Sequence, residues 1–164
     1  FRKLYDEALE WVERIEQIVD TLPSEEEKKH EEISVIFRRA RIFYETKDYD
    51  QAEKLFQRVQ QKSQSIGWQR FSITAQRSLA DINIIKGNLD QAESLLQTGL
   101  PIASRNKDKK GVAFYKRSFA RLARKRGNIE EMRRWAREAR DGFERLGMIY
   151  QTNEMRGLLK EETR

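Results

Sequence analysis

The sequence predicts an all-α protein of about eight helices that are arranged as antiparallel pairs. Three observations lead to this prediction. First, the 164 residues include only 8 Gly and 2 Pro, while residues that favour helix, such as Ala, Leu, Glu, Gln, Lys and Arg, are abundant. Second, several residue types recur every 40 positions, as in stacked helical repeats. Third, each copy holds an Asp or Asn with Gln or Glu three positions later, which is typical of a helix start.

The 40-residue spacing is found in small and in polar residues. One register holds Ala40, Ala80 and Ala120. A second register holds Ala52, Ala92 and Met132. A third holds the helix-start residues Asp48, Asn88 and Asn128, with Gln51, Gln91 and Glu131 three positions later. We therefore expect three equivalent helix pairs.

The turns between helices are predicted from residues that tolerate a left-handed backbone, which commonly ends a helix. Gly fills most of these positions, and Lys replaces it twice. The turns within repeats are expected at Lys47, Gly87 and Gly127, and those between repeats at Gly67, Lys107 and Gly147.

The helices follow from these turns. The first is expected at 2–21 and the second at 24–46, where Ser24 and Glu27 form a capping box. Pro101 lies inside a predicted helix, so a kink or break is expected around 97–101. The remaining helices are expected at 49–65, 69–86, 89–105, 109–126, 129–146 and 149–162.

The second helix of each pair resembles the second-helix signature of tetratricopeptide repeats (TPRs). The resemblance is carried by Tyr49-Asp50-Gln51-Ala52 with Phe56, by Gly87-Asn88-Leu89-Asp90-Gln91-Ala92 with Leu96, and by Gly127-Asn128-Ile129-Glu130-Glu131. It covers nearly the whole chain, although the 40-residue period exceeds the usual 34. The resemblance implies a right-handed α-solenoid, a TPR-like superhelix, in a single domain of residues 1–164.

The same resemblance implies how the chain is divided. Tyr5-Asp6-Glu7-Ala8 matches Tyr49-Asp50-Gln51-Ala52, so the chain is expected to open on the second helix of an incomplete repeat. Long repeats of this kind resemble those of bacterial signal-peptide receptors and of signalling ATPases, so we expect a fragment of a larger regulatory or signalling protein. The expected parts are a half-repeat at 1–22, repeats at 24–67, 68–107 and 108–147, and a C-terminal capping helix at 148–164.

Composition argues against several functional classes. The chain has no cysteine and a single histidine, His30, which excludes cysteine-based catalysis and thiolate zinc sites, and His30 itself is expected at the surface. No Gly-rich phosphate loop occurs, and no apolar run approaches a membrane span. We expect no enzyme, cofactor, metal or membrane association, and a cytoplasmic location. Three tryptophans are expected to pack between helices: Trp11, Trp68 and Trp135.

Positive charge is concentrated in the C-terminal half. Residues 1–68 hold 12 basic and 15 acidic residues, whereas residues 101–140 alone hold 14 basic and 4 acidic ones. Such a block either forms a solvated face or attracts an anionic partner.

In TPR arrays, ligands usually lie along a concave groove lined by the first helix of each pair. Several arginines would stack on one wall of such a groove, where guanidinium groups bind carboxylate or phosphate through paired hydrogen bonds. Alternatively, they pair with acids such as Asp81 or Glu45. The groove residues expected from the repeat are Phe37, Arg41, Tyr44, Arg77, Asp81, Phe114, Arg117, Arg121, Arg124 and Lys125.

The leading hypothesis is therefore a non-catalytic scaffold that binds a protein or peptide, acidic or phosphorylated, in a basic groove. The alternative is a nucleic-acid-binding repeat domain that uses the basic surface of residues 101–140. A third possibility is a regulatory module whose partner is another domain of the same protein.

Overall fold

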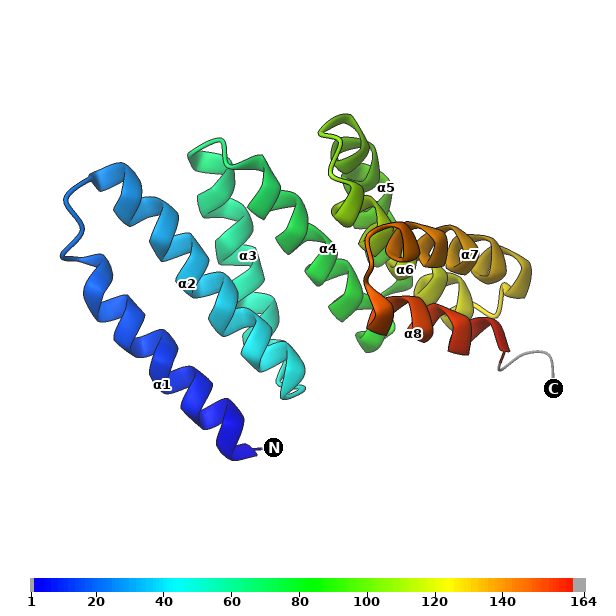
Figure 1. Cartoon of the computed structure of the whole chain (residues 1–164), viewed down its shortest axis with the longest axis horizontal. Coiled ribbons are helices and arrows are strands. Elements are labelled where there is room, and N and C mark those ends of the chain that lie inside the picture. The colour runs from blue at the N-terminus through cyan, green and yellow to red at the C-terminus, as the bar shows by residue number, and fades with distance from the viewer. Residues whose placement is uncertain (1, 161–164) are drawn as a thin grey trace. The chain divides into compact units, whose positions relative to one another are not determined.

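The computed structural model describes residues 2–160, which form eight α-helices and no strand (Figure 1). Their order and number are those predicted from the repeat, and each end lies within about two residues of its expected position. Positions 161 and 162 of the last predicted helix lie outside the described residues. The helices are α1 (Arg2–Val19), α2 (Glu25–Glu45), α3 (Tyr49–Ser65), α4 (Gln69–Lys86), α5 (Leu89–Arg105), α6 (Lys109–Lys125), α7 (Ile129–Arg145) and α8 (Ile149–Lys160).

The chain divides into two compact units, which we describe separately. Unit 1 is Phe1–Ala75 and unit 2 is Gln76–Arg164, so the boundary falls inside α4. In unit 1, α1 packs on α2 and α2 packs on α3. In unit 2, α5 packs on α6, α6 on α7 and α7 on α8 (Figure 1). Short turns between consecutive packed helices make each pair antiparallel. This is the arrangement of an α-solenoid, whereas the handedness and the repeat boundaries stay predictions.

The predicted turns have the expected backbone conformation. Gly67, Gly87, Gly127 and Gly147 all have positive φ, between 67° and 87°. The two exceptions to Gly, Lys47 and Lys107, adopt the same conformation with φ of 65° and 55°. For a residue with a Cβ atom this conformation costs about 1 kcal/mol, so the fold imposes the turn geometry even where the sequence lacks Gly.

Most of the predicted helix caps are confirmed, and one is wrong. The carboxylate of Asp48 and the amide oxygen of Asn128 accept backbone N–H groups three residues later, each at 3.2 Å, and Ser24 caps α2. Asn88 makes no such bond. Its side chain instead donates to the side-chain oxygen of Asn83, at 3.2 Å, because a buried asparagine lies within reach at the end of α4.

Of the kink or break predicted around 97–101, the break does not occur, and the kink stays a prediction. Helix α5 runs through it from Leu89 to Arg105. Pro101 lies on the exposed side of the helix, where water can hydrogen-bond the carbonyl that the missing N–H leaves unpaired.

The alanines of the first two 40-residue registers lie in the cores of the two units. Ala40 and Ala52 are fully buried in unit 1, as are Ala80, Ala92 and Ala120 in unit 2. Small side chains at these positions let neighbouring helices approach closely. In unit 2 this extends to Gly99 of α5, where an added Cβ would overlap the ring and hydroxyl of Tyr115 on α6.

Aromatic side chains complete the packing. Trp68 stacks on Phe71 with ring centroids 4.1 Å apart, and Trp135 stacks on Phe119 at 4.7 Å. These two tryptophans pack as predicted. The prediction for Trp11 is wrong, because its side chain is 62% exposed. His30 is half-buried rather than fully at the surface, and its ring packs edge-on against Trp68 with the ring centroids 4.6 Å apart.

Candidate functional site

The ten predicted groove residues are divided between the two units. Three of them, Phe37, Arg41 and Tyr44, belong to unit 1, and seven belong to unit 2. The two sets are therefore described one after the other. The unit 2 set forms a cluster of charged side chains.

In unit 1, the predicted groove aromatics are mainly packing residues. Phe37 on α2 is half-buried, with its ring centroid 5.7 Å from Phe56 on α3 and 5.3 Å from Phe71 on α4. Tyr44 packs edge-on against Tyr49 at 5.7 Å. Arg41 is exposed, and it is the member of this set that offers charge to the surface.

In unit 2, a buried carboxylate organises the predicted arginines. Asp81 on α4 is 3% exposed, and its Oδ2 lies 3.0 Å from the guanidinium of Arg77, one helical turn earlier. The same oxygen lies 3.5 Å from Arg117 and 4.0 Å from Arg121, both on α6. Its other oxygen, Oδ1, accepts the hydroxyl of Ser118 at 2.6 Å. One carboxylate thus joins α4 to α6 through the guanidinium groups of Arg117 and Arg121 and the hydroxyl of Ser118, while Arg77 pairs with it from α4 itself.

A second carboxylate, not predicted from the sequence, faces two of these arginines from α8. Oε1 of Glu154 lies 2.5 Å from Nη2 of Arg121, and its Oε2 lies 3.5 Å from Nη1 of Arg117. Glu154 stands 40 positions after Phe114. Applying the repeat to the last helix would therefore have placed it in this cluster. We call the set Arg77, Asp81, Arg117, Ser118, Arg121 and Glu154 the arginine cluster.

Phe114 forms an apolar border of the arginine cluster. The guanidinium carbons of Arg77 and Arg117 lie 5.0 and 4.8 Å from the centroid of its ring, within the range of a cation–π contact. Phe114 also packs edge-on against Phe143 in the core, at 5.0 Å. Since both guanidinium groups lie over this ring, the ring limits the movement of Arg77 and Arg117.

The carboxylate of Asp81 stays ionised throughout the neutral range. Burial raises the pKa of Asp81, but the charges of Arg77, Arg117 and Arg121 and the Ser118 hydroxyl outweigh it and hold the pKa below its ordinary value. Burial lowers the pKa of Arg117, although Asp81 acts in the opposite direction. Arginine nevertheless stays protonated in proteins.

Access to the cluster differs among its arginines. The side chains of Arg77 and Arg117 are only 14% and 13% exposed, whereas that of Arg121 is 35% exposed. Arg124 and Lys125, at the end of α6, are exposed. Three of the five predicted arginines are thus brought together, but two of these three are held by Asp81 inside the protein.

Other basic residues of unit 2 differ in how far they are neutralised. Arg126 bonds to both Asp90 and Glu93 of α5 at 2.7 Å. The turn between α5 and α6 is different. Its four exposed cations are Arg105, Lys107, Lys109 and Lys110, and no carboxylate among residues 4–160 pairs with them.

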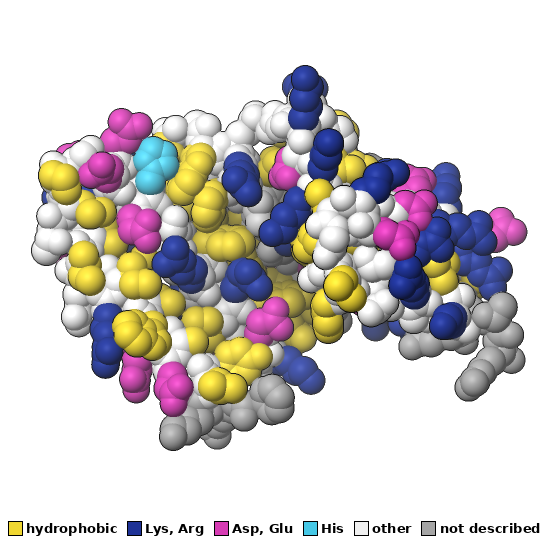
Figure 2. Space-filling model, in the orientation of Figure 1, with side chains coloured by type: hydrophobic (Ala, Val, Ile, Leu, Met, Phe, Trp, Pro, Cys, Tyr) yellow, Lys and Arg dark blue, Asp and Glu magenta, His cyan; other side chains and the backbone are white. Residues whose placement is uncertain are grey.

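Figure 2 shows Lys and Arg side chains, interspersed with acidic ones, over the surface where α7 and α8 lie.

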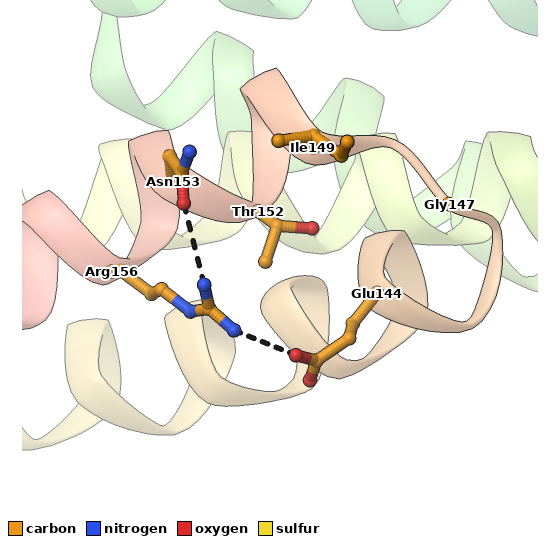
Figure 3. Close-up of a pocket in the computed structure, with 6 residues that line it drawn as sticks. All are labelled: Glu144, Gly147, Ile149, Thr152, Asn153 and Arg156. Atoms are coloured by element: carbon orange, nitrogen blue, oxygen red, sulfur yellow. Dashed lines mark hydrogen bonds and ion pairs between the residues drawn. The ribbon is translucent and has the colours of Figure 1, made fainter.

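A small pocket of about 120 Å³ lies at the turn between α7 and α8 (Figure 3). Arg156 crosses it and donates to Glu144 at 2.7 Å and to Asn153 at 3.4 Å. None of the predicted groove residues lines this pocket. The residues around it are Glu144, Gly147, Ile149, Thr152, Asn153 and Arg156.

Within the described residues, no group of three or more His, Cys, Asp or Glu side chains could hold a metal ion. The helices of that same part of the chain also include none that is long and apolar enough to cross a membrane.

The chain is similar to two solved TPR-like structures. BtubC (BKLC) from P. vanneervenii superposes with a TM-score of 0.65 at 16% identity, over 96% of this chain and 74% of that one. A kinesin light chain-like protein of Podosopora anserina, with nearly identical TPR-like repeats, gives 0.58 at 15% identity, over 98% and 90%. No family model matches the sequence, and no curated protein matches it.

Identities this low show the fold alone. The class of protein is therefore defined by architecture: an all-α helical-repeat chain of the TPR-like kind.

Proposed function

We propose that the chain is a scaffold that binds an acidic segment of a protein or peptide beside the arginine cluster of unit 2. The observation that carries the proposal is the charge balance of this cluster, in which three guanidinium groups meet two carboxylates. Lys125 adds positive charge one turn further along α6. The arginine cluster and Lys125 together therefore carry more positive than negative charge, and a partner's carboxylates or phosphates can neutralise the excess.

The cluster suits recognition better than catalysis. Its side chains are fixed by one another and by Phe114, so binding would cost little side-chain entropy. Arg121 is the main contact in this proposal, because it combines a fixed position with the largest exposure of the three. Arg77 and Arg117 act as its support. As such a scaffold, the chain would serve as a regulatory or sensor module, with a separate protein or another domain as its partner.

Charge reversal at Arg121 tests this proposal. We expect Arg121→Glu to weaken the binding of a fluorescein-labelled hexaglutamate peptide at least about tenfold at an ionic strength of about 0.1 M, because an attraction becomes a repulsion. Fluorescence anisotropy measures the dissociation constant, and circular dichroism confirms that the variant is folded. The milder Arg121→Gln should give a smaller loss in the same direction.

Arg105→Glu is the matched control, because it changes the net charge equally at an exposed site on the α5–α6 turn. It should leave hexaglutamate affinity within about twofold of wild type, since screening limits distant charges. Equal losses from both variants would show that the peptide responds only to net charge and would contradict the proposal.

Nucleic-acid binding is the second candidate, and it rests on the α5–α6 turn. There, four exposed cations lie within six residues without a carboxylate partner among the described residues. Phosphate backbones bind such clusters with a steep dependence on salt. If this candidate is correct, Lys109→Glu with Lys110→Glu removes oligonucleotide binding and Arg121→Glu does not. Absence of binding by single- and double-stranded probes at low salt would exclude it.

A further inference from the structure

The two oxygens of Glu154 occupy the arginine pair in the way that a ligand's carboxylate would. Each oxygen faces a different guanidinium, Oε1 that of Arg121 and Oε2 that of Arg117. Because Arg117 and Arg121 are one helical turn apart on α6, their forks converge on one point. The geometry is that of a carboxylate held by two arginines.

We propose that Arg117 and Arg121 form a carboxylate-binding subsite that the chain's own Glu154 occupies, and that an acidic ligand binds by displacing Glu154. This inference rests on the proposed function and names its ligand group, a side-chain or terminal carboxylate. It also gives the site a built-in competitor, which weak or singly charged ligands would not displace.

Three features favour exchange at Glu154 over exchange at Asp81. The Glu154 side chain is 25% exposed, whereas that of Asp81 is 3% exposed. Asp81 is also bound by the Ser118 hydroxyl, while the contacts that the structure shows for Glu154 are those with the two arginines. Finally, Glu has an additional rotatable bond, so its carboxylate can move to solvent while the backbone of α8 stays in place.

The position of Glu154 on α8 explains how its departure leaves the fold intact. Helix α8 is held on α7 by Thr152, Met155 and Leu158, all of them buried. Glu154 is not among these buried residues. Its pair with Arg121 is partly solvated, and such pairs add little to stability. Arg117, which is more deeply buried, keeps Asp81 as its counter-charge when Glu154 leaves.

The test compares Glu154→Gln with Glu144→Gln. Both remove one negative charge from unit 2, and both residues pair with an arginine, since Glu144 lies 2.7 Å from Arg156. We expect Glu154→Gln to bind the fluorescein-labelled hexaglutamate peptide about fivefold more tightly than wild type or better. Glu144→Gln should change the affinity less than twofold. Glu154→Ala, which removes the competing group altogether, should behave like Glu154→Gln.

The dependence on salt provides a second readout. The gain in peptide affinity from Glu154→Gln should shrink as ionic strength rises. Screening weakens both the internal pair of Glu154 with the arginines and the pair that the peptide's carboxylate forms in its place. Thermal unfolding of the variants should stay close to that of wild type, which confirms that the change lies in binding.

Each outcome bears on one of the two proposals. Tighter binding by the Glu154 variants alone supports displacement, even if wild type binds too weakly to measure. Equal binding by wild type and all variants would overturn displacement and leave the scaffold proposal standing. Weaker binding by the Glu154 variants would show that Glu154 positions Arg121 for the ligand and would overturn displacement. Failure of every protein to bind would overturn both proposals.

Discussion

At the scale of single residues, Asp81 decides the character of the candidate site. It is a buried carboxylate with three guanidinium groups within 4.0 Å. Removing one partner of such a buried set leaves uncompensated charge, which is far more costly than losing a surface pair. The arginines that the sequence assigns to ligand binding therefore also have a structural task.

Asp81→Asn should lower the free energy of unfolding by about 3–5 kcal/mol at pH 7, because Arg77 and Arg117 lose their buried counter-charge. Urea unfolding followed by circular dichroism measures this change. Asp90→Asn is the control: Asp90 also pairs with an arginine, but its side chain is fully exposed, so stability should be nearly unchanged.

The pH dependence follows from the lowered pKa of Asp81. Its contribution to stability is present above the unfolded pKa of about 3.9 and is lost as pH falls through the lower pKa of the folded state. Between pH 4 and pH 2.5, wild type should therefore lose stability more steeply than Asp81→Asn. Parallel curves for the two proteins would show that Asp81 titrates alike in the folded and unfolded states.

At the scale of helices, the close approach of α5 and α6 depends on Gly99. A methyl group there would meet the Tyr115 ring, which is 1% exposed and has no free space to move into. The structure also offers a helical glycine without this constraint, Gly157 on α8, where an added Cβ meets nothing within 4 Å.

Gly99→Ala should destabilise the protein by about 1–3 kcal/mol through overpacking. Gly157→Ala should stabilise it by up to about 1 kcal/mol, because alanine is the better helix former. Thermal unfolding of the two variants measures both effects. Stabilisation by both variants would mean that α5 and α6 do not pack through Gly99.

The sequence alone predicts the helices well, because their ends are marked by local chemistry. Asp48 and Asn128 cap α3 and α7, and the turns are marked by residues with positive φ. The exceptions depend on tertiary surroundings that no local pattern records. Asn88 bonds to the buried Asn83 instead of capping α5.

The candidate site is less predictable for the same reason. The repeat places Arg77, Arg117 and Arg121 near one another, but it does not reveal how deeply Asp81 is buried or that Glu154 reaches them from α8. Whether an arginine is available to a ligand depends on these long-range contacts. The repeat therefore places three of the predicted arginines in one cluster, and their pairs with Asp81 and Glu154 reduce the charge that is available to a ligand.

At the scale of the whole molecule, the fold is that of a TPR-like repeat protein, and the balance of charge distinguishes its parts. Residues 1–68 are slightly acidic, whereas residues 101–140 are strongly basic. In unit 2 the arginine cluster and the α5–α6 turn are two separate concentrations of positive charge. They make different predictions about the partner, an acidic peptide in the first case and a polyanion in the second.

The most direct test of the account is a titration of the ¹⁵N-labelled protein with hexaglutamate, followed by NMR. We predict saturable shifts of the backbone amides around Phe114, Arg117, Arg121 and Glu154, and of the arginine side-chain Nε–H signals in this cluster. Largest shifts at Lys107–Lys110, or no saturable shift at all, would contradict an acidic-peptide site on the arginine cluster.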